Sequence, residues 1–348
     1  MSGPAPSLFD PKQASPEQWA RYHAFRRRRH DESDPEEPYW PDRVNQMELM
    51  LERPQEIDVH LVADTGQEIL AGASLEIPRP GSPGFESNRG IVYFKVYVLE
   101  KERRRGLARA FLRPIAEVAR EHGCRVIGTE SQEAAGEAAA RSLGMEPRYA
   151  ERKTRLELQA VDWPMVERWA GEGPRRSPDL RLVRYLGLPP REEWPAYSRA
   201  ITELFNDIPF EGLEHGDVVI TPETLDDMDR RLARGGGQVL SFQAKDAAGA
   251  VLGLTEVALW EDQPEHAWQW LTAVRESARG RGIGRWLKAE MLLHLRRQHP
   301  RRRWVLTDNA GSNAPMLKIN TELGFAAYKV VTTYQMPFEE FEKRASRS

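Results

Sequence analysis

The residues Val274-Arg-Glu-Ser-Ala-Arg279-Gly280-Arg281-Gly282-Ile283-Gly284 decide the fold, because they join a strand to a helix through a glycine-containing turn. The strand is predicted over 266–274. The helix has one apolar face, made by Ile283, Leu287, Met291 and Leu295. Glycines let the backbone approach a ligand closely, and the first N–H groups of a helix are unpaired at its positive end. With two arginines beside it, the turn predicts an anion site, for example for a pyrophosphate.

The glycine spacing separates this turn from two other phosphate-binding motifs. Gly280-x-Gly282-x-Gly284 is not the G-x-G-x-x-G pattern of dinucleotide-binding folds. The chain also lacks a G-x-x-x-x-G-K-[ST] segment, so a P-loop is excluded.

The same order of elements occurs a second time in the chain. In the first half, a predicted strand ending at Val98 leads to Arg103-Arg104-Arg105-Gly106-Leu107-Ala108 and then to a helix. Aligning Arg103 with Arg279 places Val98 on Val274 and keeps the Leu-Gly pairs at 143–144 and 323–324 close to register. Such a repeat indicates one fold, duplicated. We therefore predict an α/β fold with a mixed sheet in each of two tandem domains.

The composition of one segment suggests where the domains divide. Residues 169–179 are rich in Gly, Pro and charge, which is typical of a linker. The predicted domains are 1–160 and 180–348, with 161–179 as the linker. A chain of 348 residues is also longer than one hydrophobic core usually serves.

The repeated motif resembles a known family. The pattern [Q/R]-x-x-G-x-[G/A] between a strand and a helix is the coenzyme A signature of the GNAT N-acetyltransferases. It occurs here as Arg103-x-x-Gly106-x-Ala108 and as Arg279-x-x-Gly282-x-Gly284. The later segment from Asn309 through Asn313 and Met316 to Leu-Gly-Phe325 also looks like the family's N-x-x-[A/M]…L-G-F region. The whole chain resembles a tandem GNAT protein.

The resemblance implies a sheet whose fourth and fifth strands splay apart, with acetyl-CoA in the resulting V and no metal. The pantetheine arm would pair with the fourth strand like an extra strand, and a backbone N–H there would stabilise the oxyanion. The amine would attack directly, without an acyl-enzyme. In the second half the implied cofactor residues are Thr272, Ala273, Val274, Arg279, Gly280, Arg281, Gly282, Ile283, Gly284, Asn309, Asn313 and Met316. In the first half they are Val98, Arg103, Arg104, Arg105, Gly106, Leu107 and Ala108.

Acetyl transfer to an ammonium substrate needs a base, and an acid would assist the departing thiolate. Glu256 is the first candidate base, with a solvated edge-strand residue as the alternative reading, and His266 is the second. Many GNATs carry an acidic tyrosine seven residues after the Asn, but that position is Asn320 here. Tyr328 is a possible substitute acid, or a core aromatic. Alternatively, water protonates the thiolate, since a thiol with a pKa of about 8.5 leaves readily.

The two copies are unequal. The first half has Glu133 at the position of Asn313 and Ala140 at that of Asn320. Pro114 lies inside its predicted helix, where it should remove a hydrogen bond and kink the axis. We expect the first domain to keep the fold, to bind acetyl-CoA weakly or not at all, and to shape the acceptor groove.

Composition limits the partners. The net charge is −3, so nucleic acid is not expected, and the basic runs 26–29 and 301–303 are interpreted as solvated faces. No apolar run approaches the ~18 residues of a membrane span. One cysteine, Cys124, excludes an intrachain disulfide, and with no signal peptide we expect a cytoplasmic monomer or homodimer. The acceptor would be a small-molecule or peptide amine. A non-catalytic acyl-CoA sensor or scaffold, and aminoacyl transfer from tRNA, are the alternatives.

Overall fold

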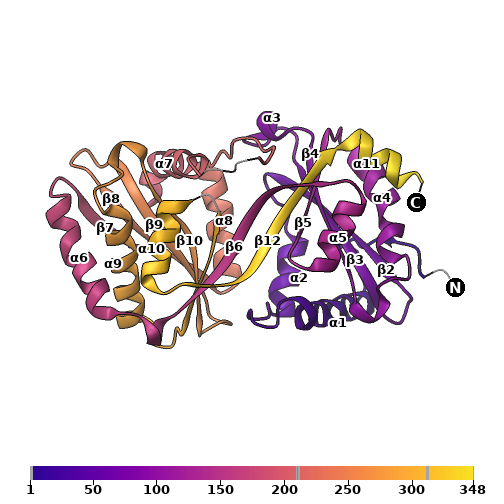
Figure 1. Ribbon diagram of the computed structural model, residues 1–348, viewed down its shortest axis with the longest axis horizontal. Coiled ribbons are helices and arrows are strands. Elements are labelled where there is room, and N and C mark those ends of the chain that lie inside the picture. Colours follow the sequence, from indigo (N-terminus) through magenta and orange to yellow (C-terminus); the bar gives the residue numbers. More distant parts are fainter. Residues whose placement is uncertain (1–2, 209, 211, 311–312, 348) are drawn as a thin grey trace. The chain divides into compact units, whose positions relative to one another are not determined.

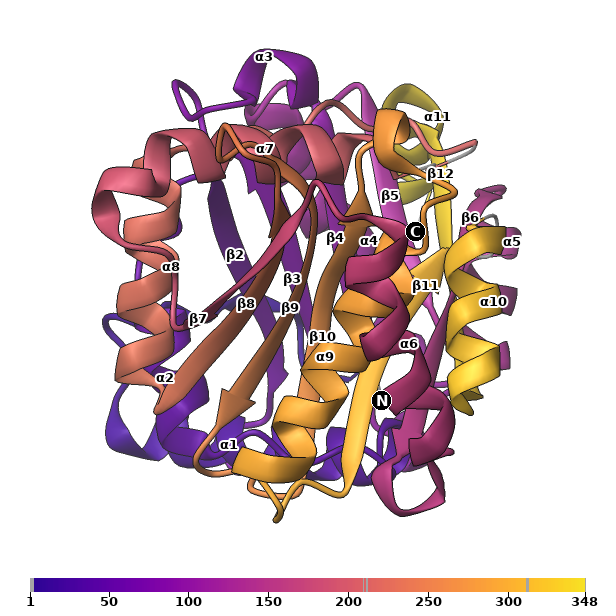
Figure 2. The ribbon, with the colours of Figure 1, turned by 90° about the vertical axis from the view of Figure 1, so that its left-hand side faces the viewer.

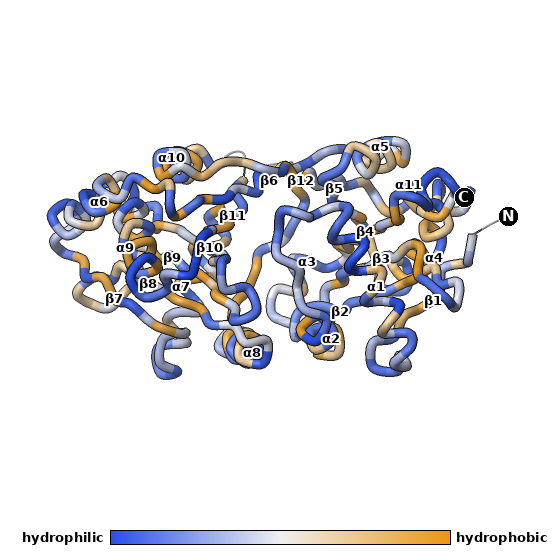
Figure 3. The backbone as a smooth tube through the Cα atoms, turned by 90° about the horizontal axis from the view of Figure 1, so that it is seen from below, coloured by the Kyte–Doolittle hydropathy of each residue, from blue (hydrophilic) through white to orange (hydrophobic). Residues whose placement is uncertain are grey.

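The computed structural model describes residues 3–347 except 209, 211, 311 and 312 (Figure 1). The chain divides into two compact units. Unit 1 consists of Met1–Tyr149, Gly212–Asp217 and Thr332–Ser348. Unit 2 consists of Ala150–Glu211 and Val218–Val331. Each unit is built on a mixed sheet, as predicted. Apolar stretches run along the central strands and the helices α4 (Leu107–Glu121) and α9 (Ile283–Gln298) (Figure 3).

The sheet of unit 1 has the strand order β1-β2-β3-β4-β5-β12, and only β4 and β5 are parallel. Its principal elements are β1 (Ser7–Leu8), α1 (Pro16–Ser33), α2 (Asp42–Met50), β2 (Glu56–Asp64), β3 (Ile69–Pro78), α3 (Phe85–Asn88), β4 (Ile91–Val98), α4 (Leu107–Glu121), β5 (Val126–Ser131), α5 (Ala134–Ser142) and α11 (Phe338–Ala345). Helix α4 is continuous through Pro114.

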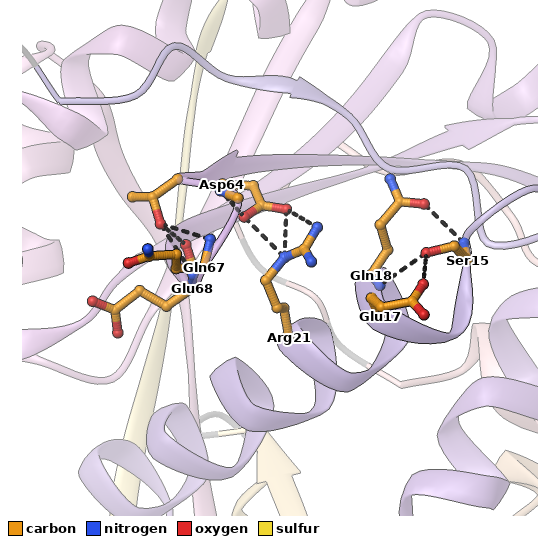
Figure 4. Close-up of polar contacts among 9 residues, drawn as sticks. Ser15, Glu17, Gln18, Arg21, Asp64, Gln67 and Glu68 are labelled. Atoms are coloured by element: carbon orange, nitrogen blue, oxygen red, sulfur yellow. Dashed lines mark hydrogen bonds and ion pairs between the residues drawn. The ribbon is translucent and has the colours of Figure 1, made fainter.

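Polar side chains fix where α1 begins and how it meets β2. Ser15 and Gln18 form a capping box at the helix start, and the bidentate Arg21–Asp64 pair ties α1 to the end of β2 at 2.8 Å (Figure 4). Both side chains of the pair are about one-fifth exposed. The pair therefore sets the position of α1 on the sheet.

The sheet of unit 2 has the order β7-β8-β9-β10-β11-β6, with β10 and β11 parallel. The helices α7 and α8 pack on one face and α6 and α9 on the other. The remaining elements are β6 (Glu146–Glu157), α6 (Trp163–Arg176), β7 (Arg181–Leu186), α7 (Trp194–Asn206), α8 (Pro222–Arg234), β8 (Gly237–Lys245), β9 (Val251–Trp260), β10 (His266–Val274), α9 (Ile283–Gln298), β11 (Trp304–Ala310), α10 (Ala314–Leu323) and β12 (Ala326–Pro337).

The last strand of each unit comes from the other half of the sequence. In β6, residues 151–157 pair with β11, and in β12, residues 332–337 pair with β5. Leu156 is buried in unit 2, whereas Met336 and Phe341 are buried in unit 1. The predicted domains 1–160 and 180–348 do not describe these units, because an alternating strand pattern does not specify which sheet edge it joins.

The predicted linker at 161–179 is wrong, because most of it is helix α6 in unit 2. The Asp162 side chain accepts a hydrogen bond from the N–H of Met165 at 3.0 Å and caps the helix. Val166 and Ala170 lie in the core beside α9. A Cβ on Gly173 would come within 2.1 Å of the Trp286 ring, so glycine serves close helix packing here. The segment's Gly and Pro content concealed this helical spacing.

Replacing the C-terminal Phe341 with alanine tests the strand exchange. Phe341 is 0% exposed in the core of unit 1, although it lies in the last helix of the chain. We expect Phe341→Ala to lower the free energy of unfolding by about 3–5 kcal/mol, because it leaves a cavity. Urea denaturation, with the exposed Glu340→Ala in the same helix as control, measures this. Protease cleavage confined to the second half in Phe341→Ala would contradict the assignment.

Candidate functional site

The two signature turns have the same backbone. Arg103 and Arg279 are extended with φ −64° and ψ 157° and 161°, and the helix caps Gly106 and Gly282 both have φ 82°. Each arginine donates from Nε to the carbonyl oxygen of the last strand residue, at 3.1 Å to Val98 and at 3.2 Å to Val274. The repeat seen in the sequence is therefore a repeat of conformation.

One position in the turns differs between the units. Gly280 has φ 78°, and its counterpart Arg104 has φ 66°, the one positive φ of a non-glycine residue among those described. A side chain in this region is strained, whereas glycine is not. The unit 2 turn is therefore the less strained copy.

In unit 2, the turn opens directly into the start of α9. The cap residue Gly282 has no side chain that could accept hydrogen bonds from the first N–H groups of α9. The start of this helix therefore suits an anion. A Cβ on Gly284 would lie 3.3 Å from Ile319 and 3.8 Å from Val274, so this glycine lets α9 approach α10 and the end of β10. Figure 2 looks onto this unit, with α6, α9 and α10 in view.

Arginines surround the unit 2 turn. Arg279 faces Asp207 at 3.4 Å, with side chains 52% and 48% exposed, and Arg281 pairs with Asp179. Exposed pairs of this kind contribute little and exchange partners readily. Arg176 of α6 donates to the carbonyl of Gly280 at 3.4 Å and lies over Gly282. Arg176 is not among the predicted site residues, because its segment reads as a linker in the sequence.

The parallel strands β10 and β11 separate beside this turn. They pair only over 266–268 and 304–306, and in the later parts β10 pairs with β9 and β11 with β6. The register of β10 against β9 shifts between Gln269 and Thr272, so one extra residue forms a bulge there. The splay implied by the family resemblance is present, and Thr272, Ala273 and Val274 lie on its β10 side.

Glu256 does not face solvent. It is 4% exposed under α7, where Tyr197 donates its hydroxyl to the Glu256 carboxyl. Burial raises the pKa of Glu256 above its usual value, and burial together with this carboxylate raises that of Tyr197. A general base needs access to the substrate proton, so this placement opposes the role suggested by the sequence.

The other two acid–base candidates lie away from the open part of the V. His266 begins β10 in the segment that still pairs with β11, and burial lowers the pKa of its imidazole. Tyr328 lies on β12, where the Arg155 guanidinium stands 5.5 Å from its ring centre. Their catalytic roles remain predictions.

The predicted asparagines gather at β11 and α10. Asn313 caps α10 by accepting from the N–H of Met316 at 3.2 Å. Asn320 donates to Asn309 at 3.2 Å, and these two side chains are 3% and 8% exposed. Asn309 therefore lies on the β11 side of the splay together with Asn320.

In unit 1, side chains of the same unit extend across the corresponding splay between β4 and β5. Strands β4 and β5 pair only from Ile91–Phe94 to Val126–Thr129. Beyond that point Glu32 of α1 accepts hydrogen bonds from the Tyr97 hydroxyl at 2.7 Å and from the Glu100 N–H at 2.9 Å. The signature Arg103 pairs with Glu133 at 2.9 Å, and the two are 26% and 29% exposed. Leu107 is buried in the core, whereas Arg105 pairs with Glu102 on the surface.

The metal-ligating types of side chain and the single cysteine bear on other kinds of chemistry. Across the part of the chain that the structure describes, no three His, Cys, Asp or Glu side chains are grouped to hold a metal ion. Cys124 is buried, and burial raises the pKa of its thiol to about 12, so it is not an activated nucleophile.

No helix among the described residues is long and apolar enough to cross a membrane.

The turn and splay, present twice, define a duplicated acyltransferase fold. The acetyltransferase (GNAT) family model matches residues 19–145 and 199–325, and the chain belongs to this family. A comparison with curated proteins finds no match.

Two solved structures resemble the chain along nearly its whole length. A tandem GNAT protein from the clavulanic acid biosynthesis pathway, solved without acetyl-CoA, has 20% identity and a TM-score of 0.75 over 96% of this chain and 98% of that one. An acetyltransferase of the same family from Sphaerobacter thermophilus has 16% identity and a TM-score of 0.63, over 96% and 95%. At these identities the likeness establishes the fold.

Replacing Glu256 with glutamine tests the base assignment. We expect Glu256→Gln to lower the rate of acyl transfer less than about tenfold, against about 10²–10⁴-fold for loss of a general base. The stability of the wild-type protein should also change with pH. Because the pKa is raised, the folded state keeps a proton that the unfolded state releases above about pH 4.5, so wild-type stability falls as pH rises there. Urea titrations should show Glu256→Gln gaining relative to wild type with increasing pH.

Lys288 supplies a second pH test. It is 2% exposed on α9, with its ammonium 5.3 Å from the Phe325 ring centre, and burial lowers its pKa from 10.5 to about 7. Between about pH 7 and 10.5 the unfolded state holds the extra proton, so wild-type stability rises with pH. Lys288→Met should stabilise the protein by about 2–4 kcal/mol near neutral pH, and the gain should shrink as pH rises. The exposed Lys318→Met should show no such trend in urea unfolding.

Proposed function

We propose that this protein is an acetyl-CoA-dependent N-acetyltransferase whose active site lies in unit 2. The acceptor would be a primary amine of a small molecule or peptide, with no nucleic acid or membrane as partner. The protein would act in the cytoplasm as a monomer or homodimer. What carries the proposal is one observation: the uncapped start of α9 lies at the end of the strand that parts from β11.

The residues present fit acetyl-CoA. Its pyrophosphate would accept hydrogen bonds from backbone N–H groups of Gly282 to Gly284, which no side-chain cap occupies. Arg176, Arg279 and Arg281 would supply positive charge. Among the described residues, Arg176 donates to the Gly280 carbonyl, and Arg279 and Arg281 pair with the exposed acids Asp207 and Asp179. The pantetheine arm would pair with 272–274 along the edge that β10 leaves open.

The chemistry follows from positioning. The amine would attack the thioester carbonyl directly, and the bulge between Gln269 and Thr272 would offer a backbone N–H to the developing oxyanion. Holding both substrates in one cleft would supply much of the rate through proximity. With Glu256 buried, the amine proton would pass to solvent.

Unit 1 would not bind acetyl-CoA. The carboxylates of Glu32 and Glu133 stand at its signature turn and repel phosphate, and Glu133 also engages Arg103. Its part would be to support unit 2 through the exchanged strand.

The buried Glu256 and the amide at position 320 favour one alternative, a sensor that binds acyl-CoA without turnover. A panel of amines with thiol release as the signal separates the two. Tight acetyl-CoA binding without release on any amine would favour the sensor.

A pair of matched variants tests the cofactor site. Gly282→Asp and Gly106→Asp introduce the same residue at the same φ of 82°, a conformation that Asp tolerates better than most residues. We expect Gly282→Asp to weaken acetyl-CoA binding more than about 100-fold, because its carboxylate would stand where the pyrophosphate binds. Calorimetric titration should give Gly106→Asp the wild-type affinity. Equal affinity in all three proteins would refute the unit 2 site.

A further inference from the structure

Two polar atoms near the splay of unit 2 lack hydrogen-bond partners among the described residues. They are Nδ2 of Asn309, a donor, and Oδ1 of Asn320, an acceptor, and both are buried within the described structure. The same side chains are joined by the Asn320 Nδ2 to Asn309 Oδ1 hydrogen bond at 3.2 Å. Buried amide groups are nearly always paired, so two open ends on one bonded pair point to a ligand.

The strand register places this amide pair at a defined level of the V. Trp268 of β10 and Leu306 of β11 form the last pair between these two strands. Asn309 is three residues further on, about 10 Å along the strand, at the level of Leu271. Leu271 lies in the bulge of β10. The amide pair and the bulge therefore stand at the same depth on opposite sides of the V.

This depth suits the reacting thioester. A bulge leaves a backbone N–H free from the neighbouring strand, and such a group can hold the carbonyl oxygen. The sulfur of the same thioester would then lie toward β11. Asn309 shares its strand face with the buried Val305, on the side of α9 and α10, where Asn320 reaches it.

We propose that Asn309 is a catalytic residue that donates a hydrogen bond from Nδ2 to the thiolate of coenzyme A as it leaves, and that Asn320 positions Asn309. The proposal rests on the function proposed above. The amine nitrogen bonds to the acyl carbon, the C–S bond breaks, and sulfur departs with the electron pair. The proton of the amine goes to solvent. An amide donates a hydrogen bond but no proton, so the product is a stabilised thiolate, which takes up a proton later.

The experiment compares coenzyme A with desulfo-coenzyme A, which lacks the sulfur. Calorimetric titration of the full chain needs no acceptor amine. We expect wild type to prefer coenzyme A by about tenfold once the pH exceeds the usual thiol pKa of about 8.5, because the donor favours the thiolate. Near pH 6 the preference should vanish.

Asn309→Asp is the decisive variant, because it keeps the size of the side chain and the oxygen that accepts from Asn320. It replaces the donor with a carboxylate, which repels a thiolate. We expect it to lose the preference at high pH, to bind desulfo-coenzyme A as wild type does, and to lower kcat about 10²–10³-fold. Gln243→Glu is the matched control, since Gln243 is another buried amide with an open atom, on β8.

Each outcome decides a separate question. Equal binding of the two ligands by wild type at every pH, or an unchanged preference in Asn309→Asp, would overturn the role of Asn309 and leave the cofactor site standing. If neither ligand binds to wild type, the proposed function fails as well. Should Asn309→Asp fail to fold, Asn309→Ser keeps a hydroxyl donor and should retain part of the preference, whereas Asn309→Ala should lose it.

Discussion

The exchanged final strands are the constraint on which the rest depends. Each parallel strand pair leaves the second strand, β5 or β11, with an edge to fill, and an unpaired edge costs backbone hydrogen bonds. Residues 332–337 fill the edge of β5, and 151–157 fill that of β11. Because β11 takes its partner on the far side, its near side is free to part from β10. The exchange thus supports the splay on which any cofactor site depends.

Duplication gave two copies of one turn, and the side chains around them set the copies apart. The backbones agree closely at Gly106 and Gly282. In unit 1, Glu32 accepts a hydrogen bond from the Glu100 N–H ahead of the turn, and Glu133 holds Arg103 in a partly buried ion pair. In unit 2 the corresponding Arg279 and its acid are about half exposed, so their attraction is screened and easily replaced by a phosphate. The same turn therefore has its arginine in a partly buried ion pair in unit 1 and in a half-exposed one in unit 2.

Burial assigns different tasks to the polar side chains of unit 2. Glu256 and Tyr197 satisfy each other beneath α7, and Lys288 lies in the core with an aromatic ring beside its ammonium. These groups cost stability rather than offering chemistry at the surface of the V. The amide pair of Asn309 and Asn320 is buried too, but it keeps one donor and one acceptor open. Two such atoms on one hydrogen-bonded pair, beside the splay, are the observation on which the proposed role of Asn309 rests.

The sequence by itself determined the duplicated α/β fold, the strand–turn–helix around Gly282 and the inequality of the two halves. These depend on local matters, namely hydrophobic periodicity, glycine at positive φ and the identity of a few side chains. The tertiary structure alone decided which sheet each last strand completes, that α6 is a helix and no linker, and that Glu256 points into the core. Those outcomes depend on contacts between residues far apart in the chain. A shift of one residue in strand register moves every side chain to the opposite face of the sheet, while the sequence pattern stays the same.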